Sequence, residues 1–262
     1  MAGARTRRSP APGVTDTEKV PVSLNPRQAQ VEYLLHAQEQ LVGARRYLAW
    51  QGELVLPELG QRVVEIGCGI GNFTGLLLDR HTVIGVDPEP AYLDNLRHRY
   101  GQHANLHTFA LEAGSDGLRA LARFHPDSCV ALNVLEHVGD DRQALVNMAS
   151  ILPPAAVIVL IVPAFPALYG PVDRNLGHYR RYTRASLARV AEAAGLQVRK
   201  ARYFNSVGFF GWWFHAHVTR LEVHPPTHIQ AFDRWIVPWL SRLERHVTPP
   251  FGQSLLAVLE KR

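Results

Sequence analysis

Short apolar runs alternate with amphipathic segments from residue 62 onward, and this pattern predicts an α/β fold. Runs of about four to eight apolar residues predict strands, and apolar residues recurring every three or four positions predict helices. Strands separated by helices pair in parallel, with helices on both faces of the sheet. The expected strands are 62–66, 82–86, 105–111, 128–133, 155–162, 196–203 and 253–259, and the expected helices between them are 73–80, 91–100, 117–124, 141–152 and 184–194.

Three regions depart from this alternation. Residues 1–25 mix Arg, Pro, Ser and Thr without periodicity, which predicts a disordered tail before a single domain over 26–262. Helical spacing over 28–56 predicts an N-terminal helical cap. Residues 206–250 are rich in Trp and Phe and predict a helical insertion before the last strand. We consider two roles for it: a lid packed on the domain, or an apolar acceptor pocket or interface for a lipid-like substrate.

A glycine-rich turn follows the first expected strand. Gly67, Gly69 and Gly71 allow the backbone to turn sharply and approach a ligand closely. Asp87 ends the next strand, where a carboxylate can accept both ribose hydroxyls of an adenosine. Because ligands of such sheets bind beyond the carboxyl ends of the strands, this turn predicts a nucleoside cofactor site.

Two residues distinguish between the possible cofactors. A dinucleotide-binding turn has its third glycine where this chain has Asn72. Glu65, two residues before the glycines, would repel a pyrophosphate and attract a ligand with an ammonium and a sulfonium group. The pattern therefore favours S-adenosylmethionine (SAM) over NAD, and a dehydrogenase becomes the less favoured alternative.

The segment from Glu65 to Asn72 resembles the first motif of class I SAM-dependent methyltransferases, and Val86-Asp87-Pro88 resembles their second. Residues 132–138, Leu-Asn-Val-Leu-Glu-His-Val, resemble the motif after strand four in the branch that includes ubiquinone-biosynthesis O-methyltransferases. The resemblance covers about residues 40–204 and the final strand. It implies a Rossmann-like, seven-stranded, mostly parallel sheet that binds SAM through Glu65, Gly67, Cys68, Gly69, Asn72, Asp87, Pro88 and Asn133.

By the same resemblance, Gly67 and Gly69 line the methionine part, Asp87 binds the ribose, and Asn133 contributes from the fourth strand. The family often has an acid at the end of strand three that reaches the adenine amine. Here residues 110–112 read Ala-Leu-Glu, so the adenine contact stays open.

Candidate catalytic residues follow the fourth and fifth strands. Glu136 and His137 come after the fourth; they act either in chemistry or as a helix cap and a packed side chain. The segment 163–182 is too long and polar for a simple connection, and its Gly-His-x-Arg-Arg-Tyr pattern resembles bacterial methyltransferases of small molecules and saccharides. We expect His178 or His137 to be the general base and Asp173 its partner.

Two further interpretations of these residues stay open. Arg180 and Arg181 either clamp an acidic acceptor or pair with Asp173 and the sheet edge. Carboxylate and imidazole groups also suit Mg²⁺ or another divalent ion, which would lower the pKa of an acceptor hydroxyl. The ligands would be Glu136, His137, Asp173 and His178.

Composition narrows the partners and the compartment. The net charge of +5, from 28 Lys and Arg against 23 Asp and Glu, is spread along the chain, which argues against a nucleic-acid substrate. Cys68 and Cys129 are the only cysteines, as expected in a reducing cytoplasm. No apolar run reaches the roughly 18 residues of a transmembrane helix. The N-terminal helices cover the site or form a homodimer.

We therefore expect methyl transfer from SAM to a small-molecule acceptor, most simply a hydroxyl oxygen of a saccharide or secondary metabolite. The alternatives within the class are N- or C-methylation, or a macromolecular acceptor. The alternative outside it is a cyclase or binding protein with this fold that no longer transfers methyl.

Overall fold

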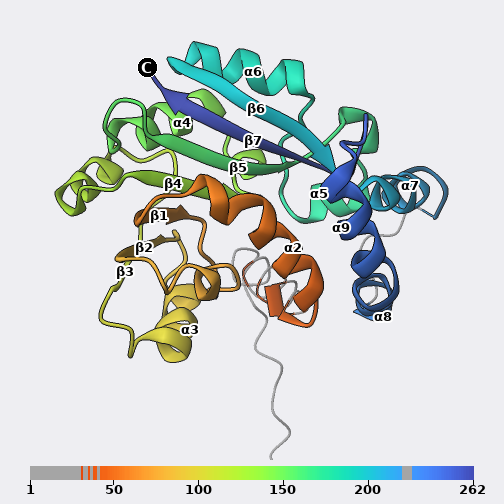
Figure 1. Ribbon diagram of the computed structural model, residues 1–262, viewed down its shortest axis with the longest axis horizontal. Helices are drawn as coiled ribbons and strands as arrows, with labels where there is room; N and C mark the ends of the chain where they lie inside the picture. The colour runs from red at the N-terminus through yellow and green to blue at the C-terminus, as the bar shows by residue number, and fades with distance from the viewer. Residues whose placement is uncertain (1–30, 32–34, 36–37, 40–41, 220–225) are drawn as a thin grey trace, which may run out of the picture.

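A seven-stranded sheet runs through the molecule in the order β3-β2-β1-β4-β5-β7-β6 (Figure 1). The computed structural model describes residues 31, 35, 38–39, 42–219 and 226–262, so the expected tail and most of the first N-terminal helix lie outside the described residues. The strands are β1 Arg62–Ile66, β2 Thr82–Val86, β3 Leu106–Phe109, β4 Ser128–Leu132, β5 Val157–Pro163, β6 Leu196–Phe204 and β7 Ser254–Lys261.

All seven expected strands are present, and only β7 runs against its neighbours. β1 pairs in parallel with β2 and β4, and β4 with β5, whereas β7 is antiparallel to both β5 and β6. The prediction of a mostly parallel seven-stranded sheet is confirmed. The carboxyl ends of β1, β2, β4 and β5 therefore lie along one edge, where loops from distant parts of the sequence meet.

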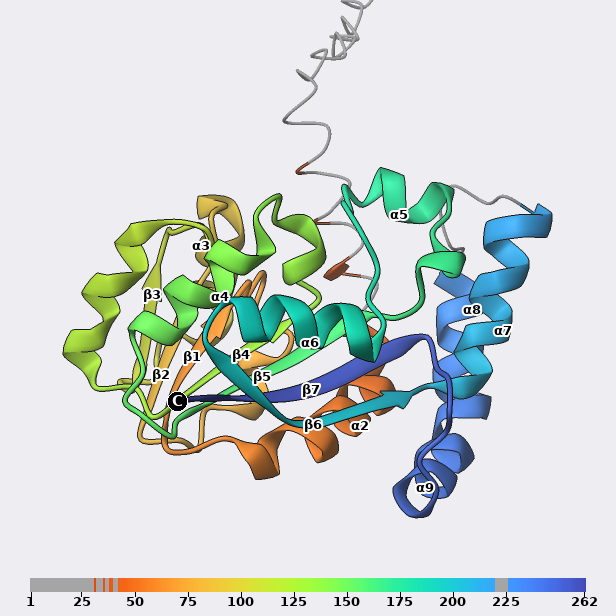
Figure 2. The same cartoon turned by 90° about the horizontal axis from the view of Figure 1, so that it is seen from above.

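Helices cover both faces of the sheet (Figure 2). Successive residues of a strand point to opposite faces, so Val63 packs with α2 and α9, whereas Val64 packs with α4 and α6. Burial of both faces explains the continuous apolar run of β5. The helices are α2 Arg45–Val55, α3 Pro90–Tyr100, α4 Asp141–Ser150, α5 Pro171–Asn175, α6 Arg184–Ala193, α7 Ser206–Phe214, α8 Pro226–Ala231 and α9 Val237–His246.

The predicted helix over 73–80 is wrong, since only a short 3₁₀ turn, Thr74–Leu76, forms there. Glycine disfavours a helix, and Gly75 packs so closely against Tyr100 that a Cβ would lie 2.7 Å from its hydroxyl. The hydroxyl of Thr74 also donates to the carboxylate of Glu65, which draws the segment onto β1. The 117–124 segment is helical as expected, but with 3₁₀ geometry over Asp116–Phe124.

The insertion between β6 and β7 is helical, as predicted, and two buried carboxylates fix it to the domain. Asp233 accepts the backbone N–H of Tyr47 at 2.7 Å, near the start of α2. Glu244 accepts the N–H groups of Asn205 and Ser206, each at 2.9 Å, at the start of α7. Within the described residues, no helix has both the length and the apolar character that crossing a membrane requires.

Candidate active site

The glycine turn lies at the carboxyl end of β1 and is bonded to β2. The N–H groups of Gly67 and Cys68 donate to the carbonyl of Val86 at 2.7 and 3.0 Å. Gly67 has a φ of 71° and Gly69 one of 52°, a region that favours glycine. A Cβ on Gly67 would overlap Val134, in the loop after β4. The turn therefore needs glycine both for its conformation and for its contact with the neighbouring loop.

Asp87 follows β2 and faces this turn. Its Oδ2 accepts the N–H of Gly69 at 2.9 Å, and its Oδ1 accepts that of Glu89 at 3.0 Å. Burial raises the pKa of Asp87, although the two backbone hydrogen bonds oppose the shift. The carboxylate thus lies beside the glycine turn and is held there by two backbone N–H groups.

Glu65 is buried beneath the turn. The Thr74 hydroxyl donates to its Oε2 at 2.6 Å. Burial, with a smaller contribution from the charge of Asp87, raises the pKa of Glu65 to about 8, although the hydrogen bond from Thr74 opposes the shift. Ionised Glu65 would therefore be stabilised by a cationic group of a ligand.

The remaining expected cofactor residues differ in what their side chains do. Cys68 packs with Leu93 and Leu96 of α3, so its side chain belongs to the core. The amide of Asn72 donates to the carbonyl of Gln38 and accepts from Arg99. Pro88 and Asn133 are exposed, and Asn133 has a φ of 53° just after β4.

Gln38 is a residue that sequence reasoning missed. Its Oε1 accepts the N–H of Ile70 at 2.9 Å, which places an N-terminal side chain directly on the glycine turn. A signal was present in the sequence, because Val31, Leu35, Gln38 and Val42 share one helical stripe on which only Gln38 is polar.

Asp173 links two cationic or ionisable side chains in the loop after β5. Its Oδ1 lies 2.9 Å from Nδ1 of His178 and accepts from Nε of Arg181 at 2.8 Å, and its Oδ2 accepts the N–H of Gly170. Burial opposes ionisation of Asp173, but the hydrogen bond from His178 and the charge of Arg181 outweigh it, so its pKa is lowered. Asp173 is therefore an ionised, buried partner for His178.

Arg181 and Arg180 are both paired. The guanidinium of Arg181 lies over the ring of Trp212 at 4.6 Å, besides its bond to Asp173. Arg180 contacts the carboxylate of Asp141 at 2.7 Å and donates to the carbonyl of Gly139. Of the two interpretations of these arginines, the geometry favours pairing within the protein over a clamp for an acidic acceptor.

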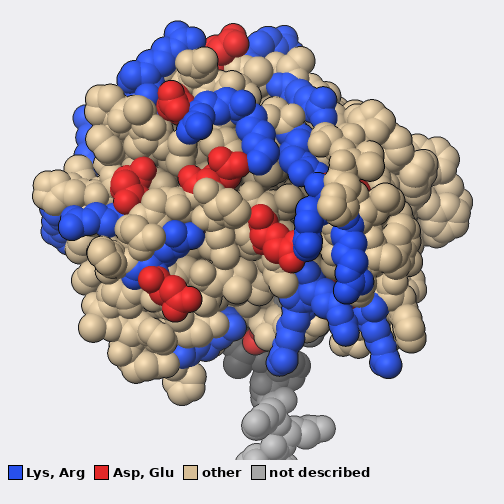
Figure 3. All heavy atoms as spheres, in the orientation of Figure 1, with Lys and Arg blue, Asp and Glu red and all other residues tan. Residues whose placement is uncertain are grey.

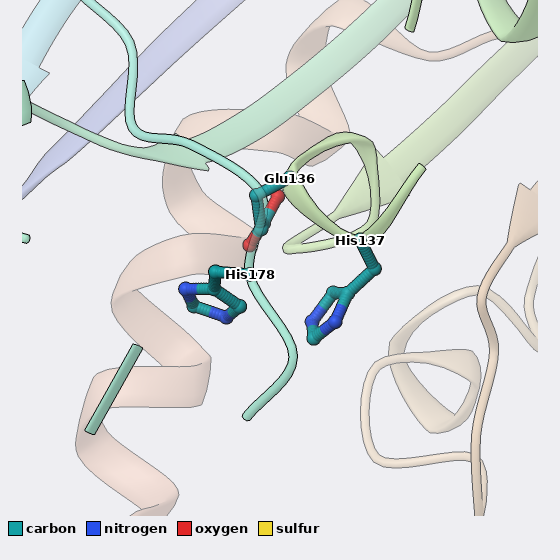
Figure 4. A group of neighbouring side chains, drawn as sticks. All are labelled: Glu136, His137 and His178. Atoms are coloured by element: carbon teal, nitrogen blue, oxygen red, sulfur yellow. The ribbon is translucent and has the colours of Figure 1, made fainter. Parts of the chain in front are cut away.

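Glu136, His137 and His178 form a cluster across two loops (Figure 4). Their ligand-type atoms all lie within 4.8 Å of one another, and the two imidazole rings meet edge-on at 4.6 Å. The loops are joined by a hydrogen bond of 2.7 Å from the N–H of Tyr179 to the carbonyl of Glu136. Asp173, the fourth residue expected in a metal set, lies behind His178 instead of among these atoms.

Glu136 does not cap the following helix, so that interpretation is wrong. The cap of α4 is Asp140, whose carboxylate accepts the N–H of Gln143 at 2.8 Å. Glu136 is 0% exposed, and neither of its carboxyl oxygens has a hydrogen-bond partner among the residues that the structure describes. Burial raises its pKa to about 8. An unpartnered buried carboxyl is costly and points to a missing ligand or proton.

His137 lies against His178. His137 is an exposed residue, but partial loss of hydration of its ring and the charge that His178 carries when protonated lower its pKa to about 4. His137 is thus a neutral imidazole near neutral pH, able to accept a proton only weakly and to act as a ligand readily.

The helical insertion packs against the loop that carries His178. His217 Nε2 lies 2.7 Å from the carbonyl of Ala167, and the rings of Phe165 and Phe209 meet at 5.4 Å. Gly170 leaves room for Ala216, which would lie 2.9 Å from a Cβ at that position. The insertion therefore borders the expected acceptor site.

Comparison with known proteins identifies a family and several solved structures that this chain resembles. Residues 33–201 match the family described as a methyltransferase domain. The chain is similar to a SAM-dependent methyltransferase from Thermotoga maritima, described as a possible histamine N-methyltransferase, with 15% identity, a TM-score of 0.60, and coverage of 88% of this chain and 97% of that one.

Two other solved structures are similar. One comes from a complex between the Trm112 methyltransferase activator of Haloferax volcanii and a putative methyltransferase, with 17% identity, a TM-score of 0.59, and coverage of 88% and 96%. The other is the [4+2]-cyclase SpnF, with 15% identity, a TM-score of 0.52, and coverage of 80% of each chain. At these identities the likeness concerns the fold.

Proposed function

This chain belongs to the methyltransferase-domain family and has the class I, SAM-dependent methyltransferase fold, and on that premise we propose that it transfers a methyl group from SAM to a hydroxyl oxygen of a small-molecule acceptor. The observation that supports an oxygen acceptor is the pairing of Asp173 with His178 beside the cofactor loops. A hydroxyl must lose its proton as it is methylated, which requires a positioned base.

The residues present fit SAM. The glycine turn brings the backbone close to a ligand, Glu65 offers a buried carboxyl to its cationic end, and Asp87 offers a carboxylate to its ribose. Gly67, Cys68, Gly69, Asn72, Pro88 and Asn133 would complete the site, Cys68 through its backbone. When bound, SAM supplies a methyl group that is already activated, so the protein needs mainly to orient the acceptor.

His178 is the proposed general base. Its Nδ1 hydrogen is held by the ionised carboxylate of Asp173, so Nε2 keeps its lone pair for the acceptor. As the methyl group moves from the sulfur of SAM to the acceptor oxygen and S-adenosylhomocysteine is left, Nε2 would take up the hydroxyl proton. Asp173 then stabilises the positive charge on the imidazole, as carboxylates do for catalytic histidines.

The carboxyl of Glu136 has no hydrogen-bond partner among the described residues, which favours a second form of this site. In this form Glu136, His137 and His178 hold a divalent ion. Mixed imidazole and carboxylate ligands suit Mn²⁺, Zn²⁺ or Mg²⁺. Such an ion would lower the pKa of the acceptor hydroxyl. Asp173 would then orient His178 from behind, as outer-shell carboxylates orient ligating histidines.

The first experiment is calorimetric titration of the purified protein with S-adenosylhomocysteine and, separately, with NAD. We expect binding of the former alone. Binding of NAD alone, or of neither, would refute the proposal. Radiolabelled SAM is then offered with pools of hydroxyl, amine and activated-carbon acceptors. Label in amines or carbon acceptors would replace O-methylation by N- or C-methylation, and conversion of an offered compound without incorporation of label would indicate a cyclase.

The two forms of the site are separated by metal titration of EDTA-treated protein with Mn²⁺ or Zn²⁺, without SAM. Stoichiometric metal binding by the parent protein supports the metal form if Glu136→Gln abolishes it. The control Glu192→Gln, on the exposed surface, should bind the metal like the parent. Full methyl transfer in EDTA by both the parent protein and Glu136→Gln excludes it.

A further inference from the structure

The outer side of the insertion carries a stripe of large apolar side chains. They recur every four positions through the π-helical turn Phe232–Ile236 and α9, so they follow one side of the segment. Trp235 is 66% exposed and Leu243 is 52% exposed, and a row of exposed apolar side chains is more informative than a single one. The stripe consists of Trp235, Trp239, Leu243 and Val247, and we call the exposed side of residues 232–247 the α9 face.

The acidic and basic side chains of this segment lie on opposite sides of it. Its only acids, Asp233 and Glu244, are buried against the N-termini of α2 and α7. Its arginines, Arg234, Arg242 and Arg245, are all exposed. Arg245 pairs with Glu53 of α2, while Arg234 lies over the ring of Trp235 at 5.0 Å. The α9 face therefore presents tryptophan and arginine side chains together.

Elements next to the α9 face also carry exposed apolar side chains or exposed basic side chains. Basic side chains gather over α2 and α9 on the face shown in Figure 3. α7, in the same insertion, contains no charged residue, and its Phe210, Trp213 and Phe214 are exposed. In both ribbon views α7 and α8 lie at the same end of the molecule (Figures 1 and 2).

We propose that the α9 face docks on the surface of a bilayer that contains anionic lipids. Tryptophan side chains favour the boundary between headgroups and acyl chains, since their rings are apolar and their N–H groups polar. Arginine side chains near an anionic lipid surface are attracted to it, and each adds to the binding. A helix with an apolar stripe and cationic flanks lies in the plane of such an interface.

The inner side of the segment supports this function. The backbone hydrogen bonds of Asp233 and Glu244 hold the helix in place before any lipid is bound, so docking orders little new structure. The insertion also contacts the loop of His178: His217 lies against the carbonyl of Ala167, and Trp212 lies under the guanidinium of Arg181. Docking would thus place a membrane next to the acceptor loop, although the proposal does not depend on methyl transfer.

The test is co-sedimentation of the full chain with vesicles of phosphatidylcholine alone or of phosphatidylcholine with phosphatidylglycerol. We expect binding to the anionic vesicles only, weakened by salt. Trp235→Ser with Trp239→Ser, and separately Arg234→Gln with Arg242→Gln, should each lower the partition coefficient about tenfold or more. All four side chains are exposed, so the variants should fold, which near-UV circular dichroism checks.

The matched control is Arg119→Gln with Arg189→Gln, which removes the same charge from exposed positions on the opposite face of the sheet. This control should bind vesicles like the parent. Equal binding by all variants would assign the interaction to other parts of the chain and refute the proposal. Absence of vesicle binding, with a dimer in sedimentation velocity that the tryptophan variants dissociate, would make the α9 face a contact between two copies.

Discussion

Nδ1 of His178 lies 2.9 Å from Oδ1 of Asp173, and the same oxygen accepts a hydrogen bond from Arg181. One carboxylate oxygen therefore fixes the orientation of the imidazole and neutralises a buried guanidinium. Substitutions of Asp173 are therefore expected to affect both the orientation of His178 and the stability of the buried pair, to an extent that depends on the substitution.

We predict that His178→Ala lowers turnover by about 10²–10⁴-fold while leaving the affinity for S-adenosylhomocysteine near normal, because the base is lost and the cofactor loops are intact. Asp173→Asn should also lower turnover, since the amide can present its N–H₂ to His178 and favour the wrong tautomer. The measurements are initial rates with labelled SAM and calorimetry. A normal rate in His178→Ala would move the base to His137 or to a metal-bound hydroxide.

Removal of the carboxylate altogether should cost stability. In Asp173→Ala the guanidinium of Arg181, 1% exposed, stays buried without its partner, and breaking such a pair costs about 3–5 kcal/mol. Asp173→Ala with Arg181→Met should recover much of that loss, since no unpaired charge remains. Urea unfolding measures both. A double variant as unstable as the single one would show that the pair's charge is not what matters.

The ribose assignment makes a prediction about Asp87. Asp87→Ala should weaken binding of S-adenosylhomocysteine by about 1–3 kcal/mol, because charge-assisted hydrogen bonds are lost. Asp94→Ala, at an exposed position of α3, is the matched control and should bind normally. Unchanged affinity in Asp87→Ala, measured by calorimetry, would remove Asp87 from the cofactor site.

Glu65 predicts a pH dependence of stability in the cofactor-free protein. Its pKa is about 8 when folded, against an ordinary value of 4.5. Between these values the unfolded chain loses a proton that the folded protein keeps, so stability falls as pH rises, by up to about 1.4 kcal/mol per pH unit. Glu65→Gln should flatten this slope.

Urea unfolding of the parent and of Glu65→Gln at about pH 5.5 and about pH 8 tests this dependence. The substitution should be more favourable at the higher pH, and Glu192→Gln, on the exposed surface, should leave the slope unchanged. Parallel slopes for Glu65→Gln and the parent would show that Glu65 ionises normally in the folded protein.

The spacing of apolar residues predicted the strands and helices correctly where burial of one or both sides of an element determines that spacing. β5 is apolar throughout because helices cover both of its faces, and α4 and α6 show helical spacing because each buries one side. The helix predicted over 73–80 does not form because its helical spacing competes with Gly75 and with the hydrogen bond between Thr74 and Glu65. Local periodicity contains no information about such a contact between elements.

The site divides in the same way. The amino-acid sequence by itself determined the glycine turn, Asp87 at the end of the second strand, and the long polar loop that holds His178, because each depends on residue type at a short spacing. Only the tertiary structure decided that the carboxyl of Glu136 has no hydrogen-bond partner among the described residues, that Asp173 binds both His178 and Arg181, and that Gln38 reaches the glycine turn. The physical reason is the strand order: β4 and β5 are neighbours, so loops some forty residues apart meet at one edge of the sheet.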